Sequence, residues 1–348
     1  MSSSGDAEAE AEAEYFSKDF EWEEVRADVE SNPSFRYHLL PFQPSKSQAE
    51  SDVRAWKRFH VRHSSGKFFK VPLSFFLNFF LVTFRELNSQ LHSQERRYLL
   101  KEFPELVSSA PHTKLLEVGC GNGSTALPIL RANKDVIVYA CDCSDETLEK
   151  AKEILGAATI VAFSHRFHTF YCDVSTDGFP NWLVCNPCRD RVLQKPSMCL
   201  SDVKHDNGMH STNPFKLEGC ECCIGGVDFV TLIFTLSAIP LERMPRFIKE
   251  CFDVLNPGGM VLFRDYGLYD MTMLRFEEDK RVGFREYMRL DGTRAYFFCL
   301  DTVRDLFVGS GFTELELDYC CVKSVNRQKG KCMRRIWVHG KFQKPVLN

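Results

Sequence analysis

Glycines and carboxylates at two points of the sequence have the spacing of a nucleoside-binding site. The first point holds, in order, Glu117, Gly119, Gly121 and Gly123, directly after an apolar run. Glycines at alternate positions let the backbone turn tightly and approach a ligand without a Cβ in the way, and a helix after the turn offers free N–H groups. The second point is Asp142, which ends the next apolar run and is placed to bind the two hydroxyls of an adenosine ribose.

The exact spacing of these glycines separates two kinds of cofactor. In the dinucleotide fingerprint G-x-G-x-x-G the third glycine lies five positions after the first, where this chain has Ser124. Here Gly123 comes one residue early, and Glu117 would repel a pyrophosphate. The acid-x-G-x-G-x-G string instead resembles motif I of the class I S-adenosylmethionine (SAM) methyltransferases, whose cofactor carries a positive sulfonium and no phosphate. A tight strand–helix turn without a ligand is the alternative that the glycines alone leave open.

Composition and charge limit the possible number of domains, the compartment and the kind of partner. A chain of 348 residues with ordinary globular composition forms one large or two small domains. We identify no signal peptide and no membrane-spanning run, so we expect the fifteen cysteines to be reduced in the cytoplasm, with the nucleus as the alternative. Residues 1–30 hold eleven acidic and two basic side chains, so the rest of the chain is mildly basic and suits an anionic partner.

The elements that must position these residues begin after an unusual N-terminal part. Residues 1–50 are predicted to be an acidic tail, disordered in the Ala/Glu tract and irregular beyond it. Residues 51–110 are predicted to form a helical cap that contains a foreign apolar stretch, 71–94. Removing this stretch would join Lys70 to Glu95 in one continuous amphipathic segment. We interpret it as a retained intron read in frame; a genuine apolar hairpin or partner-binding helix is the alternative.

Strand and helix patterns alternate through residues 111–345, which is typical of a parallel sheet with covering helices. Strands are expected at 115–119, 136–142, 167–172, 227–235, 260–264, 313–322 and 333–342. Helices are expected near 123–132, from Ser144, near 241–255 and near 301–310. The prediction is an α/β, Rossmann-like class I methyltransferase fold: a seven-stranded, mostly parallel sheet with helices on both faces and an N-terminal helical extension.

A long cysteine-rich insertion, 174–225, interrupts this alternation. Its candidate zinc ligands are Cys185, Cys188, Cys220 and Cys223, with Cys222 as an alternative in the second pair. Because the second pair lacks the usual spacing, the sequence favours a surface insertion with free thiols over a zinc site.

Several longer strings occur together and carry a family resemblance. They are F-F-K at 68–70 with E-R-R-Y at 95–98, L-I-F-T-L-S-A at 232–238, R-D-Y-G at 264–267 and D-G-T-R-x-Y-F-F at 291–298. The chain closely resembles the methyltransferase-like family that makes 3-methylcytidine in tRNA, at position 32 of the anticodon loop, over about 52–70 and 95–343. The resemblance implies SAM as cofactor, tRNA as substrate and seryl-tRNA synthetase as a candidate partner. The chain departs from the family in the 71–94 insert, in its longer cysteine-rich loop and in His60, where relatives usually carry Tyr.

The expected site residues fall into three sets. The cofactor set comprises Gly119, Gly121, Asp142, Asp173, Val174 and Ile233, to which the resemblance adds Trp56 and His60 as a lid. The RNA set comprises Phe69, Arg96 and Arg294, and the catalytic set comprises Arg264, Asp265 and Tyr266. Asp265 is the candidate to meet N4 of the base or the charge that develops on it. The bland alternatives are an Asp265–Arg294 ion pair, Trp56 as a helix anchor, and residues 296–298 as core, which the sequence favours over a stacking platform.

The expected chemistry needs little from the protein beyond placement. N3 of neutral cytidine has a free lone pair, so in-line attack on a sulfonium methyl requires no strong base, and catalysis rests on alignment. The base must be unpaired and flipped into a pocket with stacking surfaces. Two alternatives stay open: a SAM enzyme that acts on protein or a small molecule, and a catalytically impaired splice isoform that acts only as a binding module.

Overall fold

The computed structural model describes residues 18–42, 96–158, 165–185, 187–188, 222–326 and 331–346. Several predictions lie outside these residues: the disordered Ala/Glu tract 1–14, the apolar stretch 71–94, Trp56, His60, Phe69 and Cys220.

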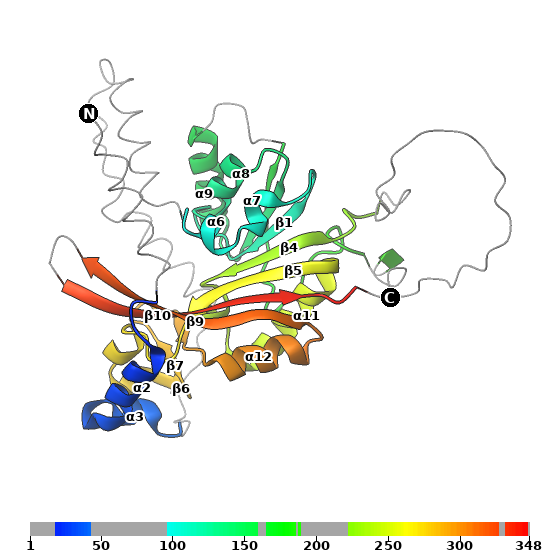
Figure 1. Ribbon diagram of the computed structural model, residues 1–348. Coiled ribbons are helices and arrows are strands. Elements are labelled where there is room, and N and C mark those ends of the chain that lie inside the picture. Colours follow the sequence, from blue (N-terminus) through cyan, green and yellow to red (C-terminus); the bar gives the residue numbers. More distant parts are fainter. Residues whose placement is uncertain are drawn as a thin grey trace, which may run out of the picture.

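A seven-stranded sheet organises the described chain (Figure 1). Its strands are β1 (Lys114–Val118), β2 (Ile137–Asp142), β3 (Phe167–Tyr171), β4 (Val227–Ile233), β5 (Leu255–Tyr266), β9 (Thr313–Asn326) and β10 (Lys331–Gln343). They lie in the order β3-β2-β1-β4-β5-β10-β9. Strands β1 to β5 pair in parallel, and β10 runs antiparallel to β5 and β9. The seven strands confirm the predicted sheet, and its order reverses between β1 and β4, where open α/β sheets bind ligands.

Helices cover both faces of this sheet, as predicted. On one face lie α6 (Leu99–Glu102), α7 (Glu105–Ser108), α8 (Ala126–Ala132) and α9 (Asp145–Ala158), and on the other lie α11 (Met244–Val254) and α12 (Leu300–Gly309) (Figure 1). Leu115 and Leu116 are neighbours on β1 but belong to the cores of opposite faces, because successive strand side chains alternate. In the described parts of the chain, no helix is long and apolar enough to cross a membrane.

A second, three-stranded sheet was not predicted. It consists of β6 (Arg281–Gly283), β7 (Glu286–Met288) and β8 (Arg294–Tyr296), paired antiparallel. The D-G-T string forms the turn between β7 and β8: the Asp291 carboxylate accepts hydrogen bonds from the Thr293 N–H and hydroxyl at 3.0 and 2.7 Å. Residues 296–298, which follow from β8, are buried, which confirms that they belong to the core.

The N-terminal segment corrects a prediction. Residues 15–50 were expected to be irregular, but the structure contains α2 (Trp22–Ser31), η1 (Pro33–Phe35) and α3 (Arg36–Leu39). Trp22, Val25 and Val29 share one face of α2 at helical spacing, and the two valines are buried. The Trp22 ring stacks on Tyr319 at 4.8 Å between ring centroids. The sequence misled because this short apolar stripe lies in a strongly acidic context.

Candidate active site

A pocket of about 450 Å³ opens at the carboxyl edge of the parallel strands. Many residues that the sequence proposed meet in its lining: Arg96, Gly119, Gly121, Asp142, Asp173, Val174, Ile233, Tyr266 and Arg294. They come from the ends of β1 to β5, the segment before α6 and the small sheet. Arg264 and Asp265 are not among the lining residues, and their surroundings are described below.

The glycine turn brings bare backbone to the pocket. Gly119 and Gly121 have φ angles of 70° and 53°, a region that glycine enters without the penalty of a side chain. A Cβ on Gly119 would lie 2.8 Å from the Thr235 side chain, whereas a Cβ on Gly121 would meet nothing within 4 Å. Gly119 is therefore fixed by packing, and Gly121 leaves space open on the ligand side.

Two carboxylates hold the loops that follow β2 and β3. Asp142 accepts hydrogen bonds from the N–H groups of Gly121 at 3.0 Å and Ser144 at 3.1 Å. It therefore ties the glycine turn to the start of α9 and still lines the pocket. Asp173 accepts from the Ser175 N–H at 3.1 Å and hydroxyl at 2.7 Å, which turns the chain so that Val174 faces the same pocket.

Glu117, the acid before the first glycine, lies beneath the turn. Its side chain is buried, and burial raises the pKa of Glu117 to about 7, while the Arg96 charge and a hydrogen bond from Thr125 act in the opposite direction. Arg96 also donates to the Ile233 carbonyl and the Thr125 hydroxyl, both at 3.4 Å. Arg96 thus joins the end of β4 to the loop before α8 at the glycine-turn side of the pocket.

Two aromatic rings, each faced by a guanidinium, form one wall of the pocket. The rings of Phe234 and Tyr266 have centroids 5.2 Å apart. The Arg96 guanidinium lies 5.4 Å from the Phe234 ring centroid, and that of Arg289 lies 5.8 Å from the Tyr266 ring centroid. Both distances allow cation–π attraction. We call these four residues the aromatic–arginine wall.

The small sheet supplies the arginines on one side of this wall. Arg289 donates to the Arg294 carbonyl at 2.7 Å and to the Thr293 hydroxyl at 3.3 Å, and Arg294 ion-pairs with Glu286 at 3.0 Å. The alternative of an Asp265–Arg294 pair therefore gives way to a Glu286 pair. Sequence reasoning missed Arg289, although its place just before the D-G-T-R turn could have paired it with Arg294 across a hairpin.

Phe234 was missed as well, and its backbone is unusual. It has a φ of 59° at the end of β4, a conformation that costs a non-glycine residue about 1–2 kcal/mol. Its N–H donates to the Arg264 carbonyl at 2.8 Å, which holds this turn against β5. Strained residues of this kind gather at functional sites, and here the strain turns an aromatic ring into the pocket wall.

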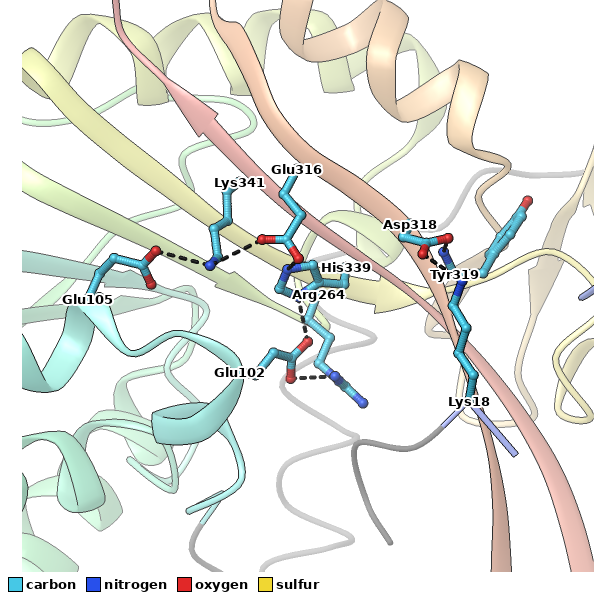
Figure 2. A network of polar contacts seen from close by, with 9 residues as sticks. All are labelled: Lys18, Glu102, Glu105, Arg264, Glu316, Asp318, Tyr319, His339 and Lys341. Carbon is cyan, nitrogen blue, oxygen red and sulfur yellow. Dashed lines mark hydrogen bonds and ion pairs between the residues drawn. The ribbon is translucent and has the colours of Figure 1, made fainter. Parts of the chain in front are cut away.

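Arg264 lies in a buried ion-pair network (Figure 2). Its guanidinium pairs with Glu102 and lies over the Trp337 ring, 4.4 Å from the centroid. Glu102 also contacts His339 Nδ1 at 2.8 Å. Burial alone would raise the pKa of Glu102, but the His339 hydrogen bond and the Arg264 charge lower it below its usual range. The expected catalytic role for Arg264 thus finds no support in its position: it joins β5 to α6.

The same network extends along the outer strands. His339 Nε2 lies 3.2 Å from Glu316, and Lys341 pairs with Glu316 at 3.2 Å and with Glu105 at 3.0 Å (Figure 2). Since Glu105 begins α7 and Lys341 lies on β10, these contacts fix the segment after Arg96 to the antiparallel side of the sheet.

Asp265 acts on the pocket through the backbone. It is fully buried, and its two oxygens accept hydrogen bonds from the N–H groups of Ser237 at 2.9 Å and Tyr266 at 2.8 Å. Burial raises the pKa of Asp265 to about 6; the bonds from Ser237 and Tyr266 and the Arg289 charge oppose that rise. Because Ser237 and Tyr266 both line the pocket, Asp265 is a positioning residue in this arrangement.

The predicted metal ligands form a separate cluster outside this pocket. Of the candidates, Cys185, Cys188 and Cys223 lie together with Cys222, the alternative in the second pair, while Cys220 lies outside the described residues.

The chain has relatives with known activities. Residues 91–317 match the methyltransferase domain family. The human tRNA N(3)-cytidine methyltransferase METTL6 is 32% identical over 269 residues, which are 76% of this chain and 79% of that protein. The Drosophila melanogaster tRNA N(3)-methylcytidine methyltransferase Mettl2 is 28% identical over 340 residues, 93% and 83% of the two chains. O-methyltransferase 3 from Dictyostelium discoideum is 31% identical over 72% of this chain and 48% of its own length.

Among solved structures, a SAM-dependent methyltransferase from Anabaena variabilis aligns with a TM-score of 0.48 and 13% identity, covering 88% of this chain and 100% of its own. The domain match spans more than half of this chain, and relatives above 30% identity align along most of their length. The chain therefore belongs to the methyltransferase family of the tRNA N(3)-cytidine methyltransferases.

Proposed function

We propose that this chain transfers a methyl group from SAM to N3 of a cytidine in tRNA. One observation carries the proposal: in a member of this family, the nucleoside end of the pocket, with Gly121 and Asp142, opens directly onto the aromatic–arginine wall. The first part suits a cofactor with an adenosine, and the second suits a flipped base. The two reactants would then meet in one pocket.

The residues present fit SAM. A pocket of about 450 Å³ lies within the size range of small-molecule sites. The open space at Gly121 admits close approach of a ligand. Asp142 would accept hydrogen bonds from the ribose hydroxyls of SAM, and Val174 would form an apolar wall for its adenine. We assign Arg96 to the cofactor's carboxylate rather than to RNA, since its contacts to Thr125 and Ile233 place it at the glycine-turn side.

Placement carries the chemistry. When bound, SAM supplies an electrophilic methyl group on a positive sulfonium. Phe234 and Tyr266 offer ring faces on which a base can stack, and the charges of Arg289 and Arg294 attract the RNA backbone. Asp265 holds Ser237 and Tyr266 in position. No residue needs to remove a proton, because N3 of cytidine attacks with its own lone pair.

The proposal extends to the position of the cytidine in tRNA, to a protein partner and to the compartment. A base that is methylated on its Watson–Crick edge must be unpaired, and this supports a loop cytidine as the target. Position 32 of the anticodon loop remains the candidate that the family resemblance implies. We keep seryl-tRNA synthetase as the candidate partner in tRNA selection. Twelve of the cysteines in the described part of the chain form no disulfide, which supports the cytoplasm as the compartment.

The test is a paired assay. The full chain and a version that lacks 71–94 are incubated with SAM and unmodified tRNA, and nucleoside mass spectrometry measures 3-methylcytidine. Product from either chain, lost with Asp142→Ala and with a tRNA whose cytidine 32 is replaced, supports the proposal. Product from the shortened chain alone also supports the retained-intron hypothesis and makes the full chain a catalytically impaired isoform.

Two results would contradict the proposal. SAM binding without 3-methylcytidine from either chain, also with the synthetase added, would favour a binding module. Methyl transfer to protein or a small molecule in place of tRNA would move the chain to another substrate class.

A further inference from the structure

Four cysteine thiols converge where the cysteine-rich insertion leaves and re-enters the fold. The sulfur atoms of Cys185, Cys188, Cys222 and Cys223 all lie within 4.8 Å of one another. Cys222 Sγ is 3.2 Å from Cys185 Sγ and 3.6 Å from Cys188 Sγ. These two separations are far above the ~2.05 Å of a disulfide bond and lie slightly below the edge of about 3.8 Å in a tetrahedron of sulfurs around zinc with Zn–S bonds of about 2.3 Å.

The backbone that carries these thiols is held in place on both sides. The Cys188 N–H donates to the Cys185 carbonyl at 3.1 Å, which makes a tight turn within the first pair. The two arms of the insertion pair through Ile224 N–H to Trp182 carbonyl and Gly226 N–H to Leu183 carbonyl, both at 2.8 Å. A site whose ligands are positioned by the fold loses little conformational freedom when a metal binds.

The donor set points to one metal. Four thiolates without oxygen ligands are the set of structural zinc sites, which are closed and tetrahedral. Zinc with four thiolates carries a net charge of −2, and the exposure of Cys222 to solvent reduces the cost of that charge.

We propose that Cys185, Cys188, Cys222 and Cys223 bind one Zn²⁺ ion in a structural site. The site joins the two ends of the 189–221 excursion just before β4 begins. The active-site pocket lies at the carboxyl end of β4, whereas Cys222 and Cys223 come just before its amino end. The metal therefore stabilises the base of the insertion and takes no part in methyl transfer. Cys222, and not Cys220, is the fourth ligand.

Metal analysis of the full chain tests the assignment. The chain, purified without chelators, is expected to contain one zinc ion per molecule by mass spectrometry of the elements. Cys188→Ser and Cys222→Ser are each expected to lose it, whereas Cys220→Ser, the matched control from the same insertion, keeps it. Zinc that is lost with Cys220→Ser and kept with Cys222→Ser would overturn the ligand set.

A second measurement needs no variant and so does not depend on whether the serine forms fold. Replacing zinc with Co²⁺ in the full chain is expected to give sulfur-to-cobalt charge-transfer bands of the intensity of four thiolates. A freshly purified chain without stoichiometric metal, or one whose intact mass shows a Cys185–Cys222 disulfide in place of zinc, would overturn the proposal. The methyl-transfer assay does not enter either outcome, so the two proposals fail independently.

Discussion

Two sets of arginines near the end of β5 show how different partners give the same side chain different roles. Arg264 pairs with the buried carboxylate of Glu102 and lies over the Trp337 ring. Arg96 and Arg289 donate to hydroxyl and carbonyl oxygens and face the rings of the pocket wall. Arg264 directs its charge to a partner inside the fold, whereas the pocket arginines extend theirs into the space where a substrate binds.

The difference teaches that a residue's place in a sequence string does not decide its task. Arg264 belongs to the R-D-Y-G string and Arg289 does not, yet Arg289 lines the pocket and Arg264 does not. What separates them is a direct ion pair: Arg264 has one with Glu102, whereas Arg289 donates hydrogen bonds to a carbonyl and a hydroxyl. If this comparison is right, the buried pair governs stability and the aromatic–arginine wall governs activity.

The largest expected effect is on stability. Glu102→Ala leaves Arg264 buried without its carboxylate, which costs about 3–5 kcal/mol, measured by denaturant unfolding. Asp28→Ala is the control: its pair with Arg334 is exposed, so the change should cost no more than about 1 kcal/mol. Equal costs for the two variants would break the comparison, because the buried pair would then be no more important than a surface one.

The next effect is on activity. Tyr266→Ala removes a ring face from the wall, and base stacking is worth about 1–3 kcal/mol, so kcat/KM for tRNA should fall about ten- to a hundred-fold. Tyr266→Phe keeps the face and should stay within a few-fold of the parent chain. If Tyr266→Phe lowered kcat/KM as much as Tyr266→Ala does, the Tyr266 hydroxyl rather than its ring face would be the important group.

A smaller effect concerns RNA affinity. Arg289→Ala should weaken tRNA binding several-fold and reduce the slope of log Kd against log salt by about 0.7, the value for one phosphate contact on a single strand. Arg304→Ala is the matched control, because Arg304 lies on α12 in exposed pairs with Asp301 and Glu314. A salt slope that both variants lower equally would mean that the RNA is not held at the small sheet.

The smallest effect is a pH dependence. The pKa of about 6 at Asp265 predicts that methyl transfer rises between pH 5 and 7 as the carboxylate becomes a full acceptor for Ser237 and Tyr266. Because this folded-state pKa lies above the unfolded value of about 3.9, the same group lowers stability as pH rises from about 4 to 6. Activity and stability should thus move in opposite directions, and Asp265→Asn should remove the step near pH 6 from the rate.

Much of the fold, and the glycine-turn side of the pocket, could be predicted from local sequence patterns. The glycine turn and Asp142 could be predicted because one strand–turn–helix unit and the tip of the next strand contain them. Phe234 and Arg289 could not, since their place depends on a strained turn at the end of β4 and on a hairpin that pairs across the D-G turn. Both placements depend on tertiary contacts, which local sequence patterns do not show.

The catalytic roles expected for Arg264 and Asp265 remain predictions, and the sequence could not show which neighbours the two side chains meet. Arg264 and Asp265 follow each other on β5, and strand alternation sends one toward Glu102 and the other toward the Ser237 N–H. The R-D-Y-G string identifies these residues, but it does not show which side chains lie next to each of them on the two faces of β5. In the same way, the sequence left open which cysteines form the second pair, and the folded arms of the insertion bring Cys222 and Cys223 to the first pair, while Cys220 lies outside the described residues.

The network around Glu102 has a consequence for how this gene can vary. The Arg96 N–H bonds to the Ser124 carbonyl, and within a few residues Glu102 and Glu105 are fastened to β5 and β10. These contacts fix the position of the chain on the sheet from Arg96 onward, and that position does not depend on the number of residues just before Arg96. In-frame changes of length between residue 42, the end of the segment that contains α2, and Arg96 are therefore expected to leave the register of the sheet unchanged, so alternative splicing and evolution can vary that stretch.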